Sequence, residues 1–189
     1  VELRGLNLAG TGVTDDGLVH LAGLENLDWL NLRSTKVTGA GFEGLSGFVA
    51  LTTLDLAISD MTDSGLAHVA GLENVQRLDL SGTDVTDEGI ARLAGMKGLR
   101  DLDLSDTRVT GPGLSELKDL KHLRALDLGG CQLSPRGIPA LAHLQNLRDL
   151  DLSWTAIDDQ SIAPLRKLEK LRILDVSSTG ITAGPSSRA

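Results

Sequence analysis

The sequence predicts an α/β fold of the solenoid type, in which short equivalent units stack side by side. Two observations predict it: an internal repeat with a constant spacing of 24 residues, and leucines inside each repeat that alternate with period two. A unit this short leaves an apolar face that only a neighbouring unit can cover, so the units fold as a stack. Eight copies occur in one phase, beginning at Leu3, Leu27, Leu51, Val75, Leu99, Leu123, Leu147 and Leu171.

Each copy begins with a short strand. In the first copy Leu6 and Leu8 lie two residues apart and therefore point to one face, while the residues beside them point to the other. A helix is about 10 Å across, whereas strands in a sheet are about 4.8 Å apart, so the helical side of the stack is the wider one. We therefore expect a right-handed horseshoe arc with a parallel sheet on its concave face and short helices on its convex face.

The helical part of each copy follows a Thr-Asp pair or its substitute. A side-chain oxygen in pairs such as Thr14-Asp15 and Thr86-Asp87 is expected to cap the start of the helix. Apolar residues then recur at three-residue spacing, as in Leu66, Val69 and Leu72. Glycines are expected to end the first four helices in a left-handed conformation, at Gly23, Gly47, Gly71 and Gly95. Prolines in copies five to seven predict less regular helix there, at Pro112, Pro135, Pro139 and Pro164.

A small polar residue follows each strand and forms a ladder along the stack. Its hydroxyl is expected to bond backbone groups of adjacent turns, because stacking buries polar atoms that need partners. The ladder comprises Thr11, Thr35, Ser59, Thr83, Thr107, Cys131, Thr155 and Thr179. Cys131 is interpreted as an inert buried thiol rather than a nucleophile, because it occupies a ladder position with no matching histidine.

The consensus LxxLxLxx(T/C)x(V/I)TDxGLxxLxxL resembles that of the leucine-rich repeat family, from Leu3 to Thr182. Among its classes it is most similar to the cysteine-containing type of F-box proteins, although its copies are shorter and its ladder residue is mostly threonine. Similar threonine ladders are familiar in bacterial proteins, which makes a bacterial origin plausible. We expect a single array over 1–182 and a flexible tail over 183–189.

Composition argues against several kinds of function. The formal net charge of −8 opposes nucleic-acid binding, and no apolar run approaches the ~20 residues that a membrane span needs. One cysteine and four scattered histidines predict neither a disulfide, a metal site nor a cofactor. The glycine motif at 39–44 fills a slot where other copies carry Thr-Asp-x-Gly-Leu, so it is not a nucleotide loop. The aspartates at 101–106 lack the glycine and glutamate of a calcium loop. No catalytic set converges, so no enzyme is predicted.

Residues beside the strand leucines face the predicted hollow and are the candidate binding residues. An acidic column there either attracts a cationic partner or only serves solubility and local hydrogen bonds. A second column, which includes Arg100, Arg124 and Arg148, is expected to lie along one edge of the acidic column and offset part of its repulsion. Two tryptophans break the pattern and either anchor a partner or pack over a neighbouring turn. The candidates are Trp29, Asp55, Arg77, Asp79, Asp101, Asp103, Asp127, Asp149, Asp151 and Trp154.

The leading hypothesis is a non-enzymatic protein-binding module, the recognition domain of a larger protein, that holds a basic protein partner on its concave face. One alternative is a structural spacer with an empty hollow. Another, implied by the family resemblance, is the substrate-recognition part of an F-box or ubiquitin-ligase-type effector. Uncapped apolar ends predict self-association end to end, or a fragment of a longer protein. Cysteine usage favours a reducing compartment, either the cytoplasm or that of a host cell.

Overall fold

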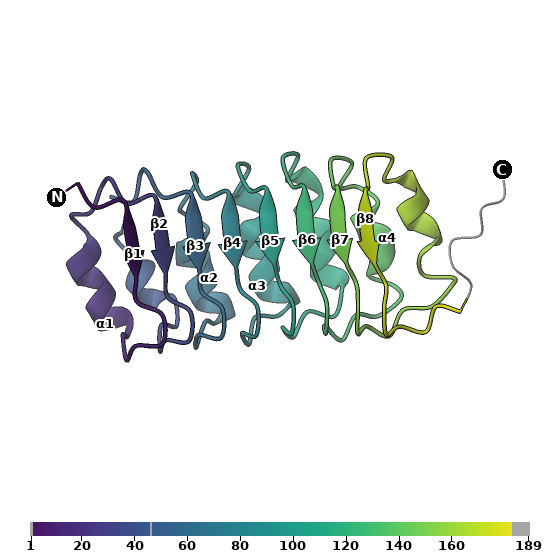
Figure 1. The fold of residues 1–189 in the computed structure, drawn as a ribbon, viewed down its shortest axis with the longest axis horizontal. Helices are drawn as coiled ribbons and strands as arrows, with labels where there is room; N and C mark the ends of the chain where they lie inside the picture. The colour runs from purple at the N-terminus through teal and green to yellow at the C-terminus, as the bar shows by residue number, and fades with distance from the viewer. Residues whose placement is uncertain (1, 46, 183–189) are drawn as a thin grey trace.

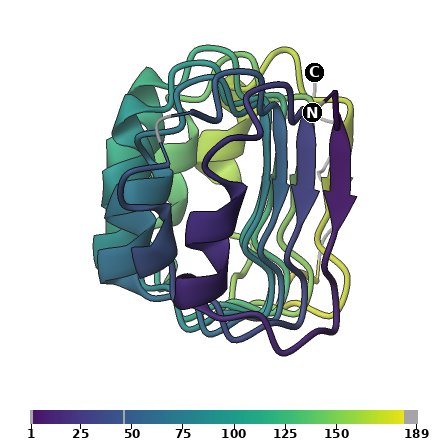
Figure 2. The same cartoon turned by 90° about the vertical axis from the view of Figure 1, so that its left-hand side faces the viewer.

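The computed structural model describes residues 2–45 and 47–182, and the predicted tail at 183–189 lies outside the described residues. Eight parallel strands form one sheet in sequence order, and the helices form a second layer on one side of it (Figures 1 and 2). The eight predicted repeats are confirmed, and we call each strand with the helical segment that follows it a rung. The strands are β1 (Gly5–Asn7), β2 (Trp29–Asn31), β3 (Thr53–Asp55), β4 (Arg77–Asp79), β5 (Asp101–Asp103), β6 (Ala125–Asp127), β7 (Asp149–Asp151) and β8 (Ile173–Asp175).

Every strand pairs with the next at a shift of one repeat. Leu54 of β3 lies opposite Leu78 of β4, and Asp55 lies opposite Asp79. The pairing continues beyond the strands, where the Leu56 amide donates to the Asp79 carbonyl at 2.9 Å. Because equivalent positions always face each other, each repeat position becomes a straight column across the sheet.

The outer layer is partly α-helical and partly 3-10 helical. The α-helices are α1 (Asp15–Leu18), α2 (Asp63–Val69), α3 (Asp87–Arg92) and α4 (Ile138–Leu141). The 3-10 segments are η1 (Val19–Leu21), η2 (Ala40–Phe42), η3 (Leu93–Gly95), η4 (Pro112–Asp119) and η5 (Ala163–Lys167). Copies five and seven thus contain 3-10 helix and copy six only four α-helical residues, in line with the prolines there.

The predicted left-handed helix stops are wrong. Gly23, Gly47, Gly71 and Gly95 have no positive φ, whereas Gly44, which the sequence did not single out, has a φ of +81°. The reason is visible after α2, where the Gly71 amide donates to the His68 carbonyl at 3.1 Å. The chain therefore tightens into a right-handed 3-10 turn at its end and needs no left-handed residue.

The core is a continuous column of leucines between the sheet and the outer layer. Strand leucines such as Leu54, Leu78 and Leu102 are 1–2% exposed, and helix residues such as Leu66 and Ile90 are fully buried. At the last strand, with no described strand beyond it, the core leucine Leu174 is 36% exposed. The apolar stack therefore depends on a neighbour on each side of every rung.

The polar ladder is buried from Thr35 to Thr155, but its bonding differs from the prediction. The Thr83 hydroxyl donates to the Leu80 carbonyl at 2.6 Å, and the Thr107 hydroxyl donates to the Leu104 carbonyl at 2.6 Å. Both carbonyls belong to the same turn as the threonine, so the expected bonds to adjacent turns are wrong at these positions. Cys131 differs, because its thiol donates to the Leu104 carbonyl of the preceding rung at 3.0 Å.

Aspartates at the helix starts join neighbouring rungs. The Asp87 carboxylate accepts hydrogen bonds from the amides of Thr110, Gly111 and Gly113 at 2.8–3.0 Å, and from the Thr110 hydroxyl. Asp15 makes the same set with the next rung. Burial alone would raise the pKa of Asp87, but these hydrogen bonds together outweigh it and lower the pKa. The capping threonines agree with prediction at α2 and α3, where Thr62 and Thr86 accept from Gly65 and Glu88, but the expected cap at α1 is wrong, because Thr14 makes no side-chain cap bond.

The Asp15 contacts also explain the glycine motif at 39–44. The amides of Gly39 and Gly41 donate to Asp15 Oδ1 at 3.2 and 2.8 Å. A Cβ on Gly41 would come within 2.6 Å of the Asp15 carbonyl oxygen, so a side chain cannot be accommodated without movement. The motif therefore cradles a carboxylate of the preceding rung.

Replacing Asp87 tests these inter-rung bonds. Asp87→Ala leaves the amides of Gly111 and Gly113 without their acceptor, and we expect the free energy of unfolding to fall by about 2–3 kcal/mol. Asp84→Ala is the matched control, because Asp84 makes an exposed ion pair with Arg108 and is expected to cost less than ~1 kcal/mol. Urea denaturation measures both, and equal losses would refute the structural role of Asp87.

Candidate functional site

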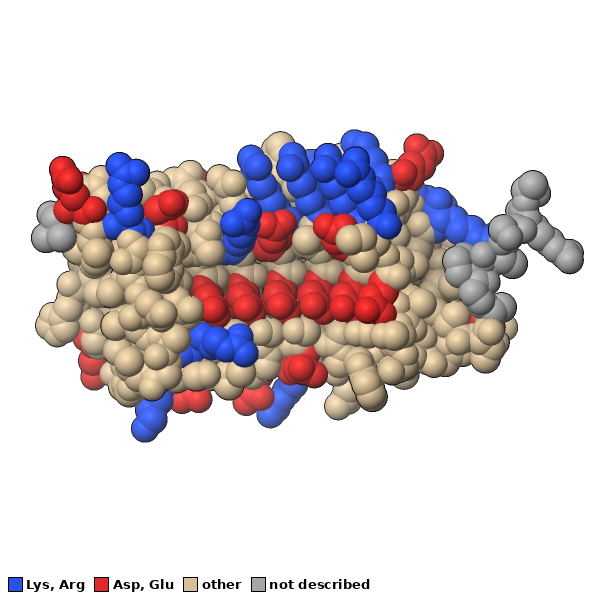
Figure 3. Space-filling view, viewed as in Figure 1, with Lys and Arg blue, Asp and Glu red and all other residues tan. Residues whose placement is uncertain are grey.

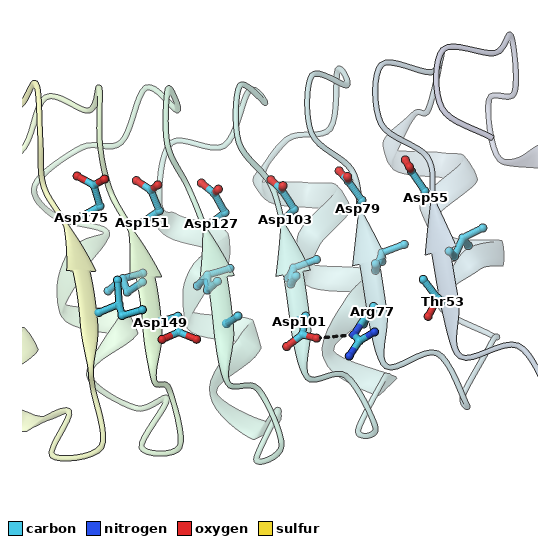
Figure 4. A pocket seen from close by; sticks show the side chains of 17 residues that line it. Thr53, Asp55, Arg77, Asp79, Asp101, Asp103, Asp127, Asp149, Asp151 and Asp175 are labelled. Atoms are coloured by element: carbon cyan, nitrogen blue, oxygen red, sulfur yellow. Dashed lines mark hydrogen bonds and ion pairs between the residues drawn. The ribbon is translucent and has the colours of Figure 1, made fainter. Parts of the chain in front are cut away.

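A groove of about 550 Å³ runs along the face of the sheet that is turned away from the helices. It crosses β3 to β8 and is lined by the residues on either side of each buried strand leucine (Figure 4). The structure thus brings seven of the predicted aspartates and Arg77 into one groove. Its lining does not include Trp29 or Trp154.

An acidic row, which we call the aspartate stripe, occupies one side of this groove. Because the strands are parallel and in register, its members are spaced at about 4.8 Å. Their side chains point out from successive strands in Figure 4, and they form an unbroken red row in Figure 3. The stripe consists of Asp55, Asp79, Asp103, Asp127, Asp151 and Asp175. Asp175 extends the set predicted as binding residues.

Each member of the stripe also closes the turn after its strand. Asp103 Oδ1 accepts from the Ser105 amide at 2.9 Å, and Asp127 Oδ1 accepts from the Gly129 amide at 2.8 Å. Asn7 and Asn31 occupy the same column in the first two rungs and accept equivalent bonds at 3.0 and 2.9 Å. The turn therefore requires a side-chain oxygen but no charge.

The charge on the stripe is held at an energetic cost. Burial, together with the charges of Asp103, Asp151 and Asp106, raises the pKa of Asp127 to about 6, against the opposing hydrogen bond from Gly129. Burial also raises the pKa of Asp55, with Asp79 adding to the effect. At the exposed end, the hydrogen bonds from Ser177 lower the pKa of Asp175. The centre of the stripe is thus where an additional positive charge would be most favourable.

The second row of the groove carries mixed charges. Arg77 Nε donates to Asp101 Oδ2 at 2.9 Å, and both side chains are partly exposed, so this pair contributes little to stability. Asp149 is exposed on β7, between Ala125 of β6 and Ile173 of β8. In this row Asp149 adds to the negative charge of the stripe, whereas the charge of Asp101 is balanced by Arg77.

The arginines expected to offset the stripe lie one row farther away. Arg100, Arg124 and Arg148 each come directly before a strand, so the row containing Asp101 and Asp149 separates them from the stripe. None of the three is among the main influences on the pKa of Asp127. The acidic and basic columns are therefore separate features of one face (Figure 3).

The two tryptophans have different surroundings. Trp29 is 42% exposed, and its indole covers Gly5 on the adjacent strand, where an added Cβ would come within 2.1 Å of Nε1. Trp154 is 73% exposed. Trp29 thus contacts its neighbouring rung, while most of the Trp154 side chain is available to solvent.

Trp154 also has an unfavourable backbone conformation. Its φ is +58°, in the left-handed region, and Ile58 at the equivalent position has a φ of +54° and is 52% exposed. The sheet holds these values, because the amides of Ile58 and Trp154 donate to carbonyls of the next rung. Three other copies carry glycine at this position, at Gly10, Gly82 and Gly130, and these glycines are the sequence signal for a positive φ here. Large apolar side chains are therefore retained where glycine is the relaxed choice.

Cys131 is a buried thiol on the polar ladder. Burial raises the pKa of the Cys131 thiol, which is 1% exposed, so it remains protonated and shielded. Within 2–45 and 47–182, no cluster of three or more metal-binding side chains occurs. No helix in the same ranges has the length and apolarity to cross a bilayer.

Comparison with known proteins agrees with this geometry. A family model described as leucine-rich repeat matches residues 71–94, 99–118, 119–142 and 143–165. The chain is a leucine-rich repeat protein. It is similar to the crystal structure of internalin C2 from Listeria monocytogenes, at 28% identity and a TM-score of 0.77, over 96% of this chain and 74% of that one. No match was found among curated proteins.

Two further structures share the fold of this leucine-rich repeat chain. An internalin (inlF) from Listeria monocytogenes is 23% identical, with a TM-score of 0.64, over 96% of this chain and 63% of that one. The plant peptide hormone receptor RGFR1 in complex with RGF2 is 20% identical, with a TM-score of 0.66, over 94% of this chain and 29% of that one. Leucine-rich repeat proteins of this kind are typically binding modules without catalytic activity.

The raised pKa of Asp127 predicts a pH-dependent stability. The folded state binds a proton more tightly than the unfolded state, so stability begins to increase as pH falls through about 6 and increases further down to about 4, where the unfolded state also binds the proton. Asp127→Asn keeps the turn, as Asn31 does, and is expected to stabilise the protein by about 1 kcal/mol at pH 7 after allowing for solvent screening. At pH 4, close to the ordinary aspartate pKa of 3.8, most of this advantage should disappear. Thermal unfolding of both proteins at the two pH values measures it, and a pH-independent difference would contradict the prediction.

The positive φ at position 154 predicts that a glycine variant is more stable than an alanine variant. Glycine adopts a positive φ without strain, whereas alanine retains the Cβ clash, so we expect Trp154→Gly to be about 1 kcal/mol more stable than Trp154→Ala. Because both variants remove the same indole, their difference isolates the backbone term. Chemical denaturation of the two variants measures it, and an alanine variant at least as stable would rule the strain out.

Proposed function

We propose that this leucine-rich repeat chain is a non-enzymatic binding module whose groove receives a basic segment of a protein partner. The observation that carries the proposal is the difference between the asparagine and aspartate rungs. Asn7 and Asn31 close the same turn without charge, so the negative charges of the six aspartates are not needed to close their turns. They raise the energy of the folded state at Asp127, which a bound cation would relieve.

The shape and surroundings of the groove support the same function. Its floor is rigid, because it consists of strands paired in register over the whole array. The two predicted anchors, Trp29 and Trp154, lie on the same sheet face or just after its strands, outside the groove lining. Exposed aromatic side chains are frequent interface anchors, and a row of charges speeds and orients encounter. In this proposal the tryptophans contribute affinity and the stripe contributes orientation.

A triple substitution tests the groove. Changing Asp103, Asp127 and Asp151 together to asparagine removes three charges and keeps the turn bonds. Affinity for a cationic probe, oligolysine, is expected to fall at least tenfold in low salt, and the dependence of affinity on salt should become flatter. Isothermal titration at several salt concentrations measures both.

The control has the same change in net charge away from the groove. Glu25, Glu73 and Glu88 are exposed and do not line it, so their joint replacement by glutamine should leave binding within about twofold of the unmodified protein. If both triple variants lose affinity equally, the groove is not the binding surface. Unaltered binding in both variants would favour the alternative of a structural spacer.

A further inference from the structure

A second depression, of about 380 Å³, is lined almost entirely by basic side chains. It lies just before β6, β7 and β8 and is bordered by Lys121, His122, Arg124, Asn146, Arg148 and Lys170. No carboxylate is among these lining residues. Figure 3 shows the blue cluster along the edge of the sheet face, apart from the aspartate stripe. Four permanent positive charges thus surround one small depression on a protein of net charge −8.

The fold places these charges next to one another. The Arg148 amide donates to the Arg124 carbonyl at 2.7 Å, and the Arg124 amide donates to the Arg100 carbonyl at 2.7 Å. The arginines therefore follow each other on adjacent rungs at about 4.8 Å spacing. The only carboxylate ion-paired with a lining residue in the described chain is Asp119, which lies 3.8 Å from Lys121 with both side chains exposed.

Asn146 organises the lysines of this pocket. Its amide Nδ2 donates to the Lys121 carbonyl at 2.7 Å, and its Oδ1 accepts from Lys170 Nζ at 2.5 Å. Asn146 and Arg148 are half-buried, whereas Arg124, Lys121 and Lys170 are exposed. One side-chain amide therefore bridges two rungs and holds an ammonium group at the pocket wall.

We propose that this basic pocket binds a compact oxyanion of the phosphate-monoester or sulfate-ester class. Guanidinium groups donate paired hydrogen bonds to such groups, and two neighbouring guanidinium groups with two ammonium groups match their three terminal oxygens and their charge. At about 380 Å³ the pocket has the size of a site for a small molecule that carries such a group. This site does not depend on the occupant of the groove.

The neighbouring stripe argues against a long polyanion. Arg124 directly precedes β6 and Asp127 ends it, so the two are three residues apart along extended chain, which corresponds to about 10 Å. This distance is close to the Debye length of about 8 Å at physiological salt, so a nucleic acid extending from the pocket would meet the repulsion of six aspartates. A compact anion is held by the near charges and avoids the stripe.

Binding of phosphoserine tests the proposal, with inorganic phosphate and glucosamine 6-sulfate as further probes. We expect saturable one-to-one binding, with an at least tenfold loss of affinity in Arg124→Gln/Arg148→Gln. Preference for phosphoserine over the sulfated sugar indicates a phosphorylated source, and the reverse preference a sulfated one. The control Arg92→Gln/Lys97→Gln removes the same charge from exposed residues outside the pocket and should stay within twofold.

Two further measurements keep the test decisive. If the arginine variant unfolds, Lys121→Gln/Lys170→Gln removes two exposed charges from the same pocket and should give the same loss. The aspartate triple variant should bind phosphoserine at least as well as the unmodified protein, which separates this site from the groove. Non-saturable binding, equal losses in variant and control, or tighter binding of a single-stranded oligonucleotide that depends on Arg124 and Arg148 would overturn the proposal.

Discussion

The structure depends on mutual burial between neighbouring rungs. A three-residue strand and one or two helical turns cannot shield a leucine such as Leu102 on their own, but a rung on each side reduces its exposure to 2%. This requirement imposes a common length on the copies, because a register shift of one residue would turn the leucines to the solvent face. The constant spacing of 24 residues and the in-register strand pairs are two expressions of the same constraint.

Polar groups are arranged around this apolar stack so that burial leaves few of them without partners. Ladder hydroxyls satisfy carbonyls within their own turn, and the carboxylates of Asp15 and Asp87 satisfy amides of the next rung. Among the described residues, no buried side-chain nitrogen or oxygen lacks a hydrogen-bond partner. The apolar contacts therefore hold the rungs together. The polar bonds hold the turn after each strand and join the start of a helix to the next rung.

Register also concentrates charge. A charged residue that recurs at the same position in successive copies forms a row of like charges across the sheet. This recurrence produces both the aspartate stripe and the arginine column. Burial, together with the neighbouring carboxylates, raises the pKa of Asp127 and so opposes folding at neutral pH, although an asparagine could close the same turn. Trp154 and Ile58 also lower stability, because each has a positive φ and an exposed apolar side chain. Such costs are common where a surface serves binding.

The sequence alone determined the number of rungs, their parallel order, the buried leucine columns and the aspartates of the groove, because each follows from a period that local chemistry reads directly. Only the tertiary structure decided three other features. The hydroxyl of Thr83 bonds its own turn, the carboxylate of Asp87 reaches the following rung, and the basic pocket assembles around Asn146 from residues of different rungs. These features depend on distances between individual side-chain and backbone atoms. The repeat pattern gives the order of the residues along the chain but not these distances.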